Sequence, residues 1–97
     1  MFKDKKVVAT IYSTTDVSLF YKNKDNRILR ESDVKQIQNF IEIGFGIFPL
    51  VVNFDGERYM ILDGHHRFEA IKRINKKLNT KLEIPFYEDW KERWNVK

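Results

Sequence analysis

The sequence predicts a small domain of the α/β (α+β) class, in which helices cover a small mixed sheet. Three observations support this class. β-rich runs such as residues 50–54 alternate along the chain with segments whose apolar residues recur at helical spacing. Turn signals such as Asp55-Gly56 separate these segments. With 97 residues, of which 42% are hydrophobic, the chain can fill one core, so we expect residues 1–97 to form a single domain.

In the N-terminal part, we expect one strand followed by a long connection. Residues 5–12 are rich in β-branched and aromatic side chains, which favours the first strand of the sheet. The polar segment 13–26 predicts a long loop, with no more than a short element near residues 17–20.

The first helix is expected after residue 31. Ser32 or Asp33 can cap it, and it should continue to Ile43 before Gly44 and Gly46 end it. Its apolar residues lie at helical spacing, and they are Val34, Ile37, Phe40 and Ile41.

A hairpin and a second helix follow. Residues 50–54 and 58–62 are expected to pair around the two-residue turn Asp55-Gly56. After a second turn at Asp63-Gly64, a helix of about four turns should end at Asn79-Thr80. The apolar face of this helix consists of Phe68, Ile71, Ile74 and Leu78.

The C-terminal part predicts a last strand and a short helix. Residues 82–86 form the strand, and Pro85 indicates an edge of the sheet or the end of the strand. Trp90 and Trp94 are four residues apart, so a terminal helix could pack both rings on the core or on a second copy of the chain, as in a homodimer. The same rings could instead stack on nucleic-acid bases.

The composition restricts the classes of function. The net charge of +4 suits an anionic partner such as a nucleotide or nucleic acid, although a Lys-rich soluble surface explains it equally. The absence of cysteine excludes disulfide scaffolds, thiolate zinc sites and thiol nucleophiles. No apolar run has the length of a signal peptide or a membrane span, so we expect a soluble, cytoplasmic protein without membrane contact.

Both histidines of the chain lie in the turn from Asp63 to Arg67. The backbone N–H groups at the start of a helix lack intrahelical acceptors and attract anions. Gly64 would let a ligand approach the backbone, and His65, His66 and Arg67 would add donors for phosphate oxygens. Asp63 could cap the helix, accept a proton or hold Mg²⁺.

Two other interpretations of this turn stay open. In the first, Asp63 only caps the helix, the histidines lie on the surface, and Arg67 pairs with Glu69 or Glu57. In the second, His65 and Glu69 bind a metal through their i, i+4 spacing, with Asp63 as a third ligand. Adjacent histidines diverge on a helix and no third histidine exists, so no metal site is expected.

At these residues the sequence resembles the ParB/sulfiredoxin superfamily. The similar stretch runs from the helix near Asp33 to the strand ending near Phe86, and it includes Phe-Pro-Leu-Val-Val and Tyr-Met-Ile-Leu-Asp-Gly-His-His-Arg-Phe-Glu-Ala. The resemblance implies a ParB/sulfiredoxin-like fold whose turn and following helix start bind nucleotide phosphates.

Three branches of the superfamily differ at this turn. Sulfiredoxins carry Gly-Cys-His-Arg, and here His65 replaces the reactive cysteine, which excludes their chemistry. The CTP-binding chromosome-partition proteins carry Gly-Glu-Arg-Arg followed by an alanine. This chain matches that pattern at Gly64, Arg67 and Ala70, whereas His65 and His66 differ from it.

The form Asp-Gly-His-His-Arg is closest to the free serine kinases and to small ParB-like proteins. This resemblance implies that Gly64, His65, His66 and Arg67 hold the phosphates of ADP or ATP. It also implies an acidic residue nearer the N-terminus that helps to activate the acceptor hydroxyl. Glu31 is the candidate for that residue, and Asp16 and Asp33 are its rivals.

The sequence therefore predicts a domain that binds ATP or another nucleotide, with Mg²⁺ as an optional partner. We expect a phosphotransferase or nucleotide hydrolase, such as an ATP-dependent kinase or ATPase, with Asp63 and Glu31 as catalytic residues. One alternative is a DNA-binding or nuclease module that uses basic residues, namely Lys3, Lys5, Lys6, Lys72, Arg73, Lys76 and Lys77. Another is a phage or mobile-element accessory protein that binds a nucleotide or signal without turnover. Phe45 and Phe48 could line the pocket or belong to the core.

Overall fold

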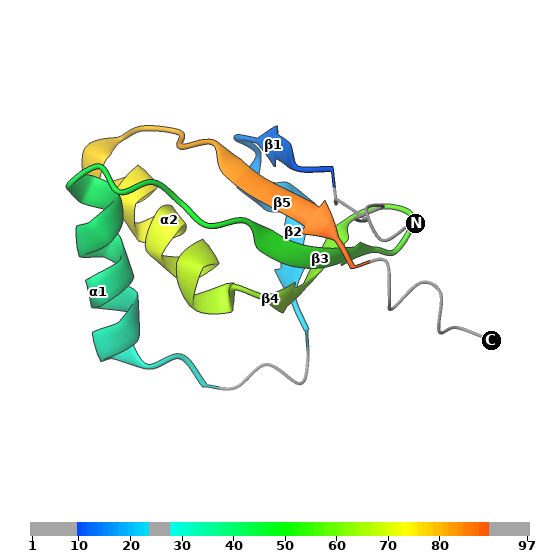
Figure 1. The fold of residues 1–97 in the computed structure, drawn as a ribbon, viewed down its shortest axis with the longest axis horizontal. Coiled ribbons are helices and arrows are strands. Elements are labelled where there is room, and N and C mark those ends of the chain that lie inside the picture. The colour runs from blue at the N-terminus through cyan, green and yellow to red at the C-terminus, as the bar shows by residue number, and fades with distance from the viewer. Residues whose placement is uncertain (1–9, 24–27, 90–97) are drawn as a thin grey trace, which may run out of the picture.

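The computed structural model describes residues 10–23 and 28–89. In it, a five-stranded mixed sheet has the strand order β1-β5-β3-β4-β2. The helices α1 and α2 gather toward one end of the sheet, and the sheet extends beyond them (Figure 1). This arrangement confirms the predicted α+β class. Within the described residues, neither helix is long and apolar enough to cross a membrane.

The first strand and the segment after it differ from the prediction. Strand β1 covers Tyr12–Thr14, and the expected residues 5–9 lie outside the described part. The predicted loop contains the expected short element, a 3₁₀ turn, η2, at Val17–Leu19, but it also contains strand β2 at Phe20–Lys22, which was not predicted. Strand β2 pairs in parallel with β4, so this short strand is defined by a partner about 40 residues away rather than by a local pattern.

Helix α1 spans Glu31–Glu42 and begins earlier than predicted. Its N-cap residue is Arg30, which makes no side-chain capping bond, so Ser32 and Asp33 lie within the first turn. The prediction that one of these two caps the helix is therefore wrong. The helix can begin at Glu31 because contacts from α2 hold its start, as described below.

The hairpin has the predicted strands with a small shift. Strand β3 covers Leu50–Phe54 and strand β4 covers Tyr59–Asp63, and they pair antiparallel with an irregularity between Val51 and Val52. The N–H of Asp55 donates to the carbonyl oxygen of Arg58 at 3.0 Å, so the connection covers residues 55–58. Asp55 thus closes the turn instead of forming its central pair with Gly56.

Helix α2 spans His65–Leu78 and ends at Asn79, as predicted, and Asn79 adopts the left-handed conformation. Its residues Phe68, Ile71 and Ile74 are buried, and the first two belong to the core cluster formed with the sheet. Leu78 is 55% exposed and does not belong to the buried face. α1 packs on α2 rather than directly on the sheet.

Strand β5 spans Ile84–Glu88 and lies inside the sheet. It pairs antiparallel with β1 and in parallel with β3. Pro85 is its second residue, near the start of the strand, so both alternatives, an edge and the strand's end, are wrong, and the strand lies two residues later than the predicted 82–86. Trp90 and Trp94 lie outside the described residues.

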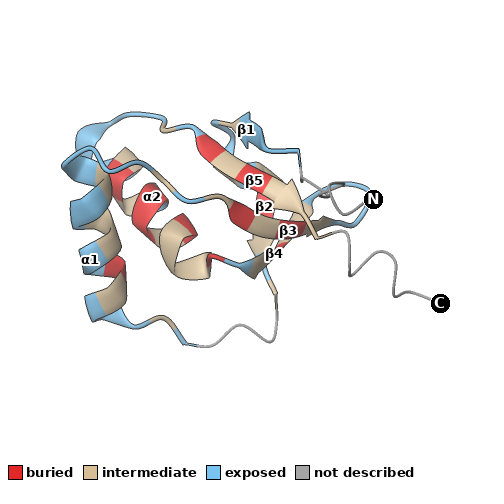
Figure 2. Ribbon diagram, in the orientation of Figure 1, coloured by how far each residue is buried: buried red, intermediate tan, exposed pale blue. Residues whose placement is uncertain are grey.

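The core lies between α2 and the sheet. Figure 2 shows buried residues, in red, on α2 and on the strands. Its largest contiguous cluster consists of Phe20, Leu50, Val52, Ile61, Phe68, Ile71, Ile84 and Phe86. Burial of these side chains fixes α2 on the sheet and thereby sets the position of the turn that precedes it.

Candidate functional site

Gly64 joins strand β4 to helix α2 in a conformation that side chains rarely adopt. Its φ angle is 106°, and it is the N-cap residue of the helix. A Cβ atom at this position would lie 2.7 Å from Cδ2 of Leu50 and 2.9 Å from Nη2 of Arg67. Both the backbone angle and the available space therefore require glycine here. The close approach to Leu50 and Arg67 brings the turn against the start of β3.

Arg67 is positioned by the same turn. Its Nη2 atom donates to the carbonyl oxygen of Pro49 at 3.2 Å and lies 3.7 Å from Oδ2 of Asp63. Its Nε atom is buried and makes no hydrogen bond with any of the described residues. The side chain of Arg67 is 23% exposed, whereas that of Asp63 is 74% exposed. A cation with an unused buried donor beside a helix start is suited to hold an anion.

Asp63 does not cap α2, but it does pair with Arg67. The N-cap of the helix is Gly64, and no side chain caps it. Of the two partners considered for Arg67, Glu69 instead pairs with Arg73 and Lys72. The ion pair between Asp63 and Arg67 is weak, because its charged atoms are 3.7 Å apart and Asp63 is exposed.

The two histidines have different surroundings. Nε2 of His66 accepts a hydrogen bond from the backbone N–H of Arg30 at 3.1 Å, which joins the starts of α1 and α2. This bond requires a lone pair on Nε2, so the proton of the neutral ring is on Nδ1. The ring of His65 lies 4.6 Å from that of His66, with the planes inclined by 40°. His66 thus has a clear structural contact in addition to any ligand it holds.

A polar cavity of about 360 Å³ lies between α1 and the start of α2. It is lined by Asp33, Gln36, Ile37, Phe40, Asp63, Gly64, His65, His66 and Arg67. Every residue that the sequence assigned to phosphate binding therefore borders one cavity. The residues of the first turn of α2 line this cavity. Their N–H groups have no acceptor within the helix, because its first intrahelical bond runs from the N–H of Phe68 to the carbonyl oxygen of Gly64.

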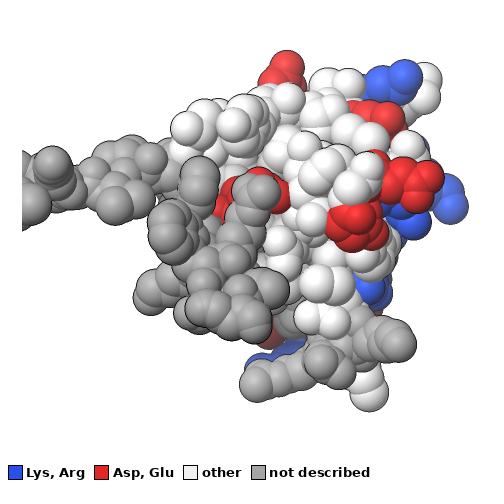
Figure 3. Space-filling view, turned by 90° about the vertical axis from the view of Figure 1, so that its right-hand side faces the viewer, with Lys and Arg blue, Asp and Glu red and all other residues white. Residues whose placement is uncertain are grey.

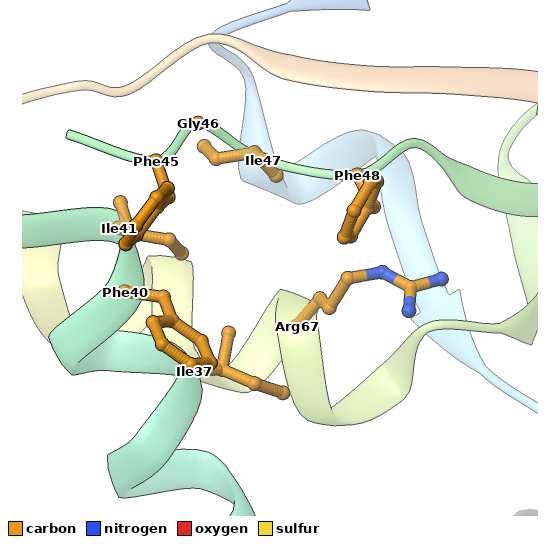
Figure 4. A pocket seen from close by; sticks show the side chains of 8 residues that line it. All are labelled: Ile37, Phe40, Ile41, Phe45, Gly46, Ile47, Phe48 and Arg67. Carbon is orange, nitrogen blue, oxygen red and sulfur yellow. The ribbon is translucent and has the colours of Figure 1, made fainter.

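An apolar cavity of about 470 Å³ adjoins the polar one (Figure 4). Ile37, Phe40 and Arg67 line both cavities, and the others lining it are Ile41, Phe45, Gly46, Ile47 and Phe48. Figure 4 shows the aromatic rings of Phe40, Phe45 and Phe48 around an open space. Phe45 and Phe48 are 72% and 77% exposed, so of the two alternatives they line the pocket rather than the core.

The contributions of Gln36 and Phe40 were not predicted. The helical spacing of Ile37 and Phe40 indicated a core face, yet Phe40 is 44% exposed and, within α1, only Val34 is fully buried. The sequence signal that could have indicated this contribution is the breadth of the apolar surface of α1. One helix packed on a single neighbour cannot bury all of it.

Glu31 lies outside the polar cavity and is bound to Arg73. Both guanidinium nitrogens Nη1 and Nη2 of Arg73 donate to its carboxylate, the second at 3.2 Å. The hydrogen bond from Arg73 holds the pKa of Glu31 below its ordinary value. Its rival Asp33 borders the cavity, whereas Asp16 accepts a hydrogen bond from the N–H of Ser18 and caps the 3₁₀ turn η2. Among the three acidic candidates, the structure brings only Asp33 to the predicted phosphate site.

Three basic residues in the C-terminal half of α2, namely Lys72, Arg73 and Lys77, pair with carboxylates. Arg73 contacts Glu31 and Glu69, Lys72 contacts Glu69, and Lys77 contacts Glu42 at 3.1 Å. In the described segments, no group of three or more histidine, aspartate or glutamate side chains is arranged to hold a metal ion. Glu69 faces Arg73, so it does not join His65 and Asp63.

Comparisons with known proteins identify the fold. No protein-family model and no curated protein matches the chain. Among solved structures, C-terminally truncated chromosome-partitioning protein ParB from Caulobacter crescentus, in complex with CTP-gamma-S, is similar with a TM-score of 0.62 and 20% identity. The similarity covers 82% of this chain and 44% of that one.

A Pnob8-like ParB-N domain is also similar, with a TM-score of 0.57 and 20% identity over 92% of this chain and 34% of that one. This chain thus spans less than half the length of either solved structure. At this identity the likeness concerns the fold. The predicted resemblance is confirmed at that level: the chain has the ParB-like fold of ParB N-terminal domains.

Proposed function

We propose that this chain binds a nucleotide across the two adjoining cavities. The observation that carries the proposal is the shared wall of Ile37, Phe40 and Arg67, which places an apolar hollow directly beside a helix start. A nucleotide has the same division into a flat, largely apolar base and a multiply charged phosphate chain. The ParB from Caulobacter crescentus, bound to CTP-gamma-S, supports a nucleotide as the ligand class.

The phosphates would lie at the start of α2. The backbone N–H groups of the first turn and the positive end of the helix dipole favour negative charge there. Arg67 would supply the buried donor Nε, and His65 and His66 line the same space. The base would lie among Phe40, Phe45 and Phe48, where ring faces are available for stacking.

Magnesium would reach the site with the nucleotide. Mg²⁺ is commonly held by phosphates, waters and only one or two carboxylates, so the lack of a protein cage in the described residues fits this mode. Asp63 and Asp33 border the polar cavity and can supply those oxygens. Their negative charge would otherwise oppose that of the phosphates, which favours a metal-bound nucleotide over a bare one.

We further propose phosphoryl transfer or nucleotide hydrolysis at this site, as in an ATP-dependent kinase or ATPase. This chemistry requires mainly charge neutralisation and positioning, which Arg67 and the helix start can provide. Asp63 or Asp33 would accept the proton of an attacking hydroxyl or water. Glu31 remains the candidate by resemblance, although its pairing with Arg73 favours a role in holding α1 on α2.

The alternative of a DNA-binding or nuclease module has less support. Lys72, Arg73 and Lys77 are paired with carboxylates, so the basic face of α2 is largely neutralised. A phage accessory protein that binds a nucleotide or signal without turnover would use the same cavities. It would differ from the proposed enzyme only in leaving the bound ligand unchanged.

The proposal is tested by titrating the purified chain with ATP, ADP and CTP, with and without Mg²⁺, by calorimetry and thermal shift. Arg67→Lys retains the charge but loses the planar fork and the Nε donor, and should weaken binding about tenfold. Lys76→Gln, near the other end of the same helix, is the matched control and should bind like wild type. If no nucleotide stabilises the chain, the proposed function is wrong.

Product analysis separates the catalytic and binding alternatives. We expect Mg²⁺-dependent loss of the γ-phosphate, abolished in Asp63→Asn or Asp33→Asn. Glu31→Gln should retain turnover if its carboxylate only pairs with Arg73. Tight binding with intact nucleotide after long incubation would support the accessory-protein alternative instead.

A further inference from the structure

Four residues of α1 line the polar cavity, and we call them the α1 stripe. They are Asp33, Gln36, Ile37 and Phe40. Their i, i+3, i+4 and i+7 spacing places them along one face of the helix. Asp33 and Gln36 line the polar cavity but not the apolar one, whereas Ile37 and Phe40 line both. Along the chain, the α1 stripe therefore passes from the polar cavity into the apolar cavity.

Gln36 lies near the middle of the α1 stripe. An α-helix rises about 1.5 Å per residue, so along the axis Gln36 lies about 4.5 Å beyond Asp33 and about 6 Å before Phe40. The start of α2 lies beside the start of α1, because Nε2 of His66 accepts the N–H of Arg30. In the proposed binding mode, the phosphates lie at the start of α2 and the base lies at the ring of Phe40. The ribose joins these two parts of the ligand, so it lies beside the middle of the stripe.

The opposite end of the molecule does not compete for the phosphates. Where the sheet extends beyond the helices, acidic side chains are prominent on the described surface, beside a few basic ones (Figure 3). A surface of this kind disfavours a multiply charged anion. The start of α2 instead combines the guanidinium of Arg67 with the positive end of a helix dipole. This difference supports the orientation that places the sugar at the α1 stripe.

The side chain of Gln36 has the chemistry that a sugar hydroxyl requires. Its amide oxygen accepts hydrogen bonds and its NH₂ group donates them, and a hydroxyl does both. The other polar side chains that the described residues contribute to this cavity are carboxylates, imidazoles and a guanidinium, which suit phosphates or Mg²⁺. Gln36 is exposed, so rotation about its side-chain bonds can bring the amide to a bound sugar. Ile37, its neighbour in the stripe, offers an apolar contact for the sugar carbons.

We propose that Gln36 hydrogen-bonds the ribose hydroxyls of the bound nucleotide, so that the site selects ribonucleotides over deoxyribonucleotides. This inference rests on the proposed function and specifies its substrate class. The 2′-hydroxyl is both a donor and an acceptor, and it is the group that distinguishes the two kinds of nucleotide. The selection is moderate, because Gln36 is exposed and water can replace a lost hydroxyl.

The test is calorimetry of the full chain with ATP, 2′-deoxy-ATP and 3′-deoxy-ATP in the presence of Mg²⁺. CTP and 2′-deoxy-CTP are measured in parallel. We expect the wild type to bind at least one deoxynucleotide about fivefold or more weakly than its ribonucleotide. Gln36→Met keeps the length of the side chain but removes the amide. It should weaken binding of the ribonucleotide by about the same factor and leave that of the deoxynucleotide unchanged, so that the discrimination disappears.

Gln38→Met is the matched control. Gln38 is on the same helix but lines a separate hollow with Lys77, so this variant should retain both the affinity and the discrimination. Equal binding of ribonucleotides and deoxynucleotides by the wild type would overturn the proposal, as would unchanged discrimination in Gln36→Met. Both results leave nucleotide binding intact, which separates them from failure of the proposed function. If no nucleotide binds at all, both proposals are wrong.

Discussion

Nε2 of His66 accepts a hydrogen bond from the backbone N–H of Arg30, and this bond joins the start of α2 to the start of α1. Arg30 is the N-cap of α1, and His66 lies in the first turn of α2. The polar cavity lies between these same two segments. The geometry of the proposed phosphate site therefore depends on a histidine that also holds the cavity's two walls together.

Replacing His66 should reveal this structural contact. His66→Leu removes the acceptor and should lower the free energy of unfolding by about 1 kcal/mol. His66→Gln places an oxygen near the position of Nε2 and should recover part of that loss. Urea denaturation of both variants measures the difference, and equal stability of the two would argue against the hydrogen bond.

Gly64 provides a test of crowding at the turn. Gly64→Ala combines an unfavourable backbone angle with a Cβ 2.7 Å from Leu50, and should cost about 2 kcal/mol or more. Gly56→Ala is the matched control, because Gly56 has a φ angle of 104° and no atom of the described residues would lie within 4 Å of the added Cβ. Its cost should be limited to about 1 kcal/mol of backbone strain. Comparable losses in the two variants would show that the contacts with Leu50 and Arg67 are unimportant.

The phenylalanines of the apolar cavity should affect binding more than stability. Phe48 is 77% exposed, so Phe48→Ala should change the free energy of unfolding by less than about 0.5 kcal/mol. Loss of a stacking ring should nevertheless weaken nucleotide binding about fivefold or more. Ile43→Ala, which is 61% exposed and does not line the cavity, should change neither quantity. Calorimetry checks the binding constant and urea denaturation the stability.

The pairing of Glu31 with Arg73 predicts a dependence of stability on pH. The hydrogen bond from Arg73 lowers the pKa of Glu31 from its ordinary value of 4.5. A carboxyl with a lowered pKa in the folded state adds stability above the unfolded pKa, and this contribution is lost as the pH falls through the folded value. Arg73→Gln should therefore be less stable than wild type at pH 7.

The difference between Arg73→Gln and wild type should shrink as the pH falls below about 4.5, where the unfolded carboxyl becomes protonated. Lys76→Gln removes a charge from the same helix and serves as the control. Midpoints of urea denaturation between pH 3 and pH 7 provide the measurement. A constant difference over this range would exclude the linkage.

Elements with a strong local pattern could be predicted from the sequence. Apolar residues at helical spacing between Gly64 and Asn79 defined α2, and the β-rich runs beside Asp55-Gly56 defined the hairpin. Strand β2 could not be predicted in this way. It has three residues, and only its pairing with β4 makes it a strand.

The candidate site was predictable where one short segment supplies it. Residues from Asp63 to Arg67 border the polar cavity together because they are neighbours in the chain. Asp33 and Phe40 reach the same cavity from α1, and their contribution depends on how that helix packs on α2. Spacing within α1 alone could not distinguish Asp33 from Glu31, because helix packing decides which of them meets Arg73.

Strand β5 pairs on one side with β1, from the opposite end of the described chain, and on the other with β3. During synthesis on a ribosome, the five-stranded sheet can therefore be completed only after residue 88 has left the exit tunnel. Until then the apolar side chains that face β5 have no cover. The emerging chain would be a natural client for chaperones that shield such surfaces during translation.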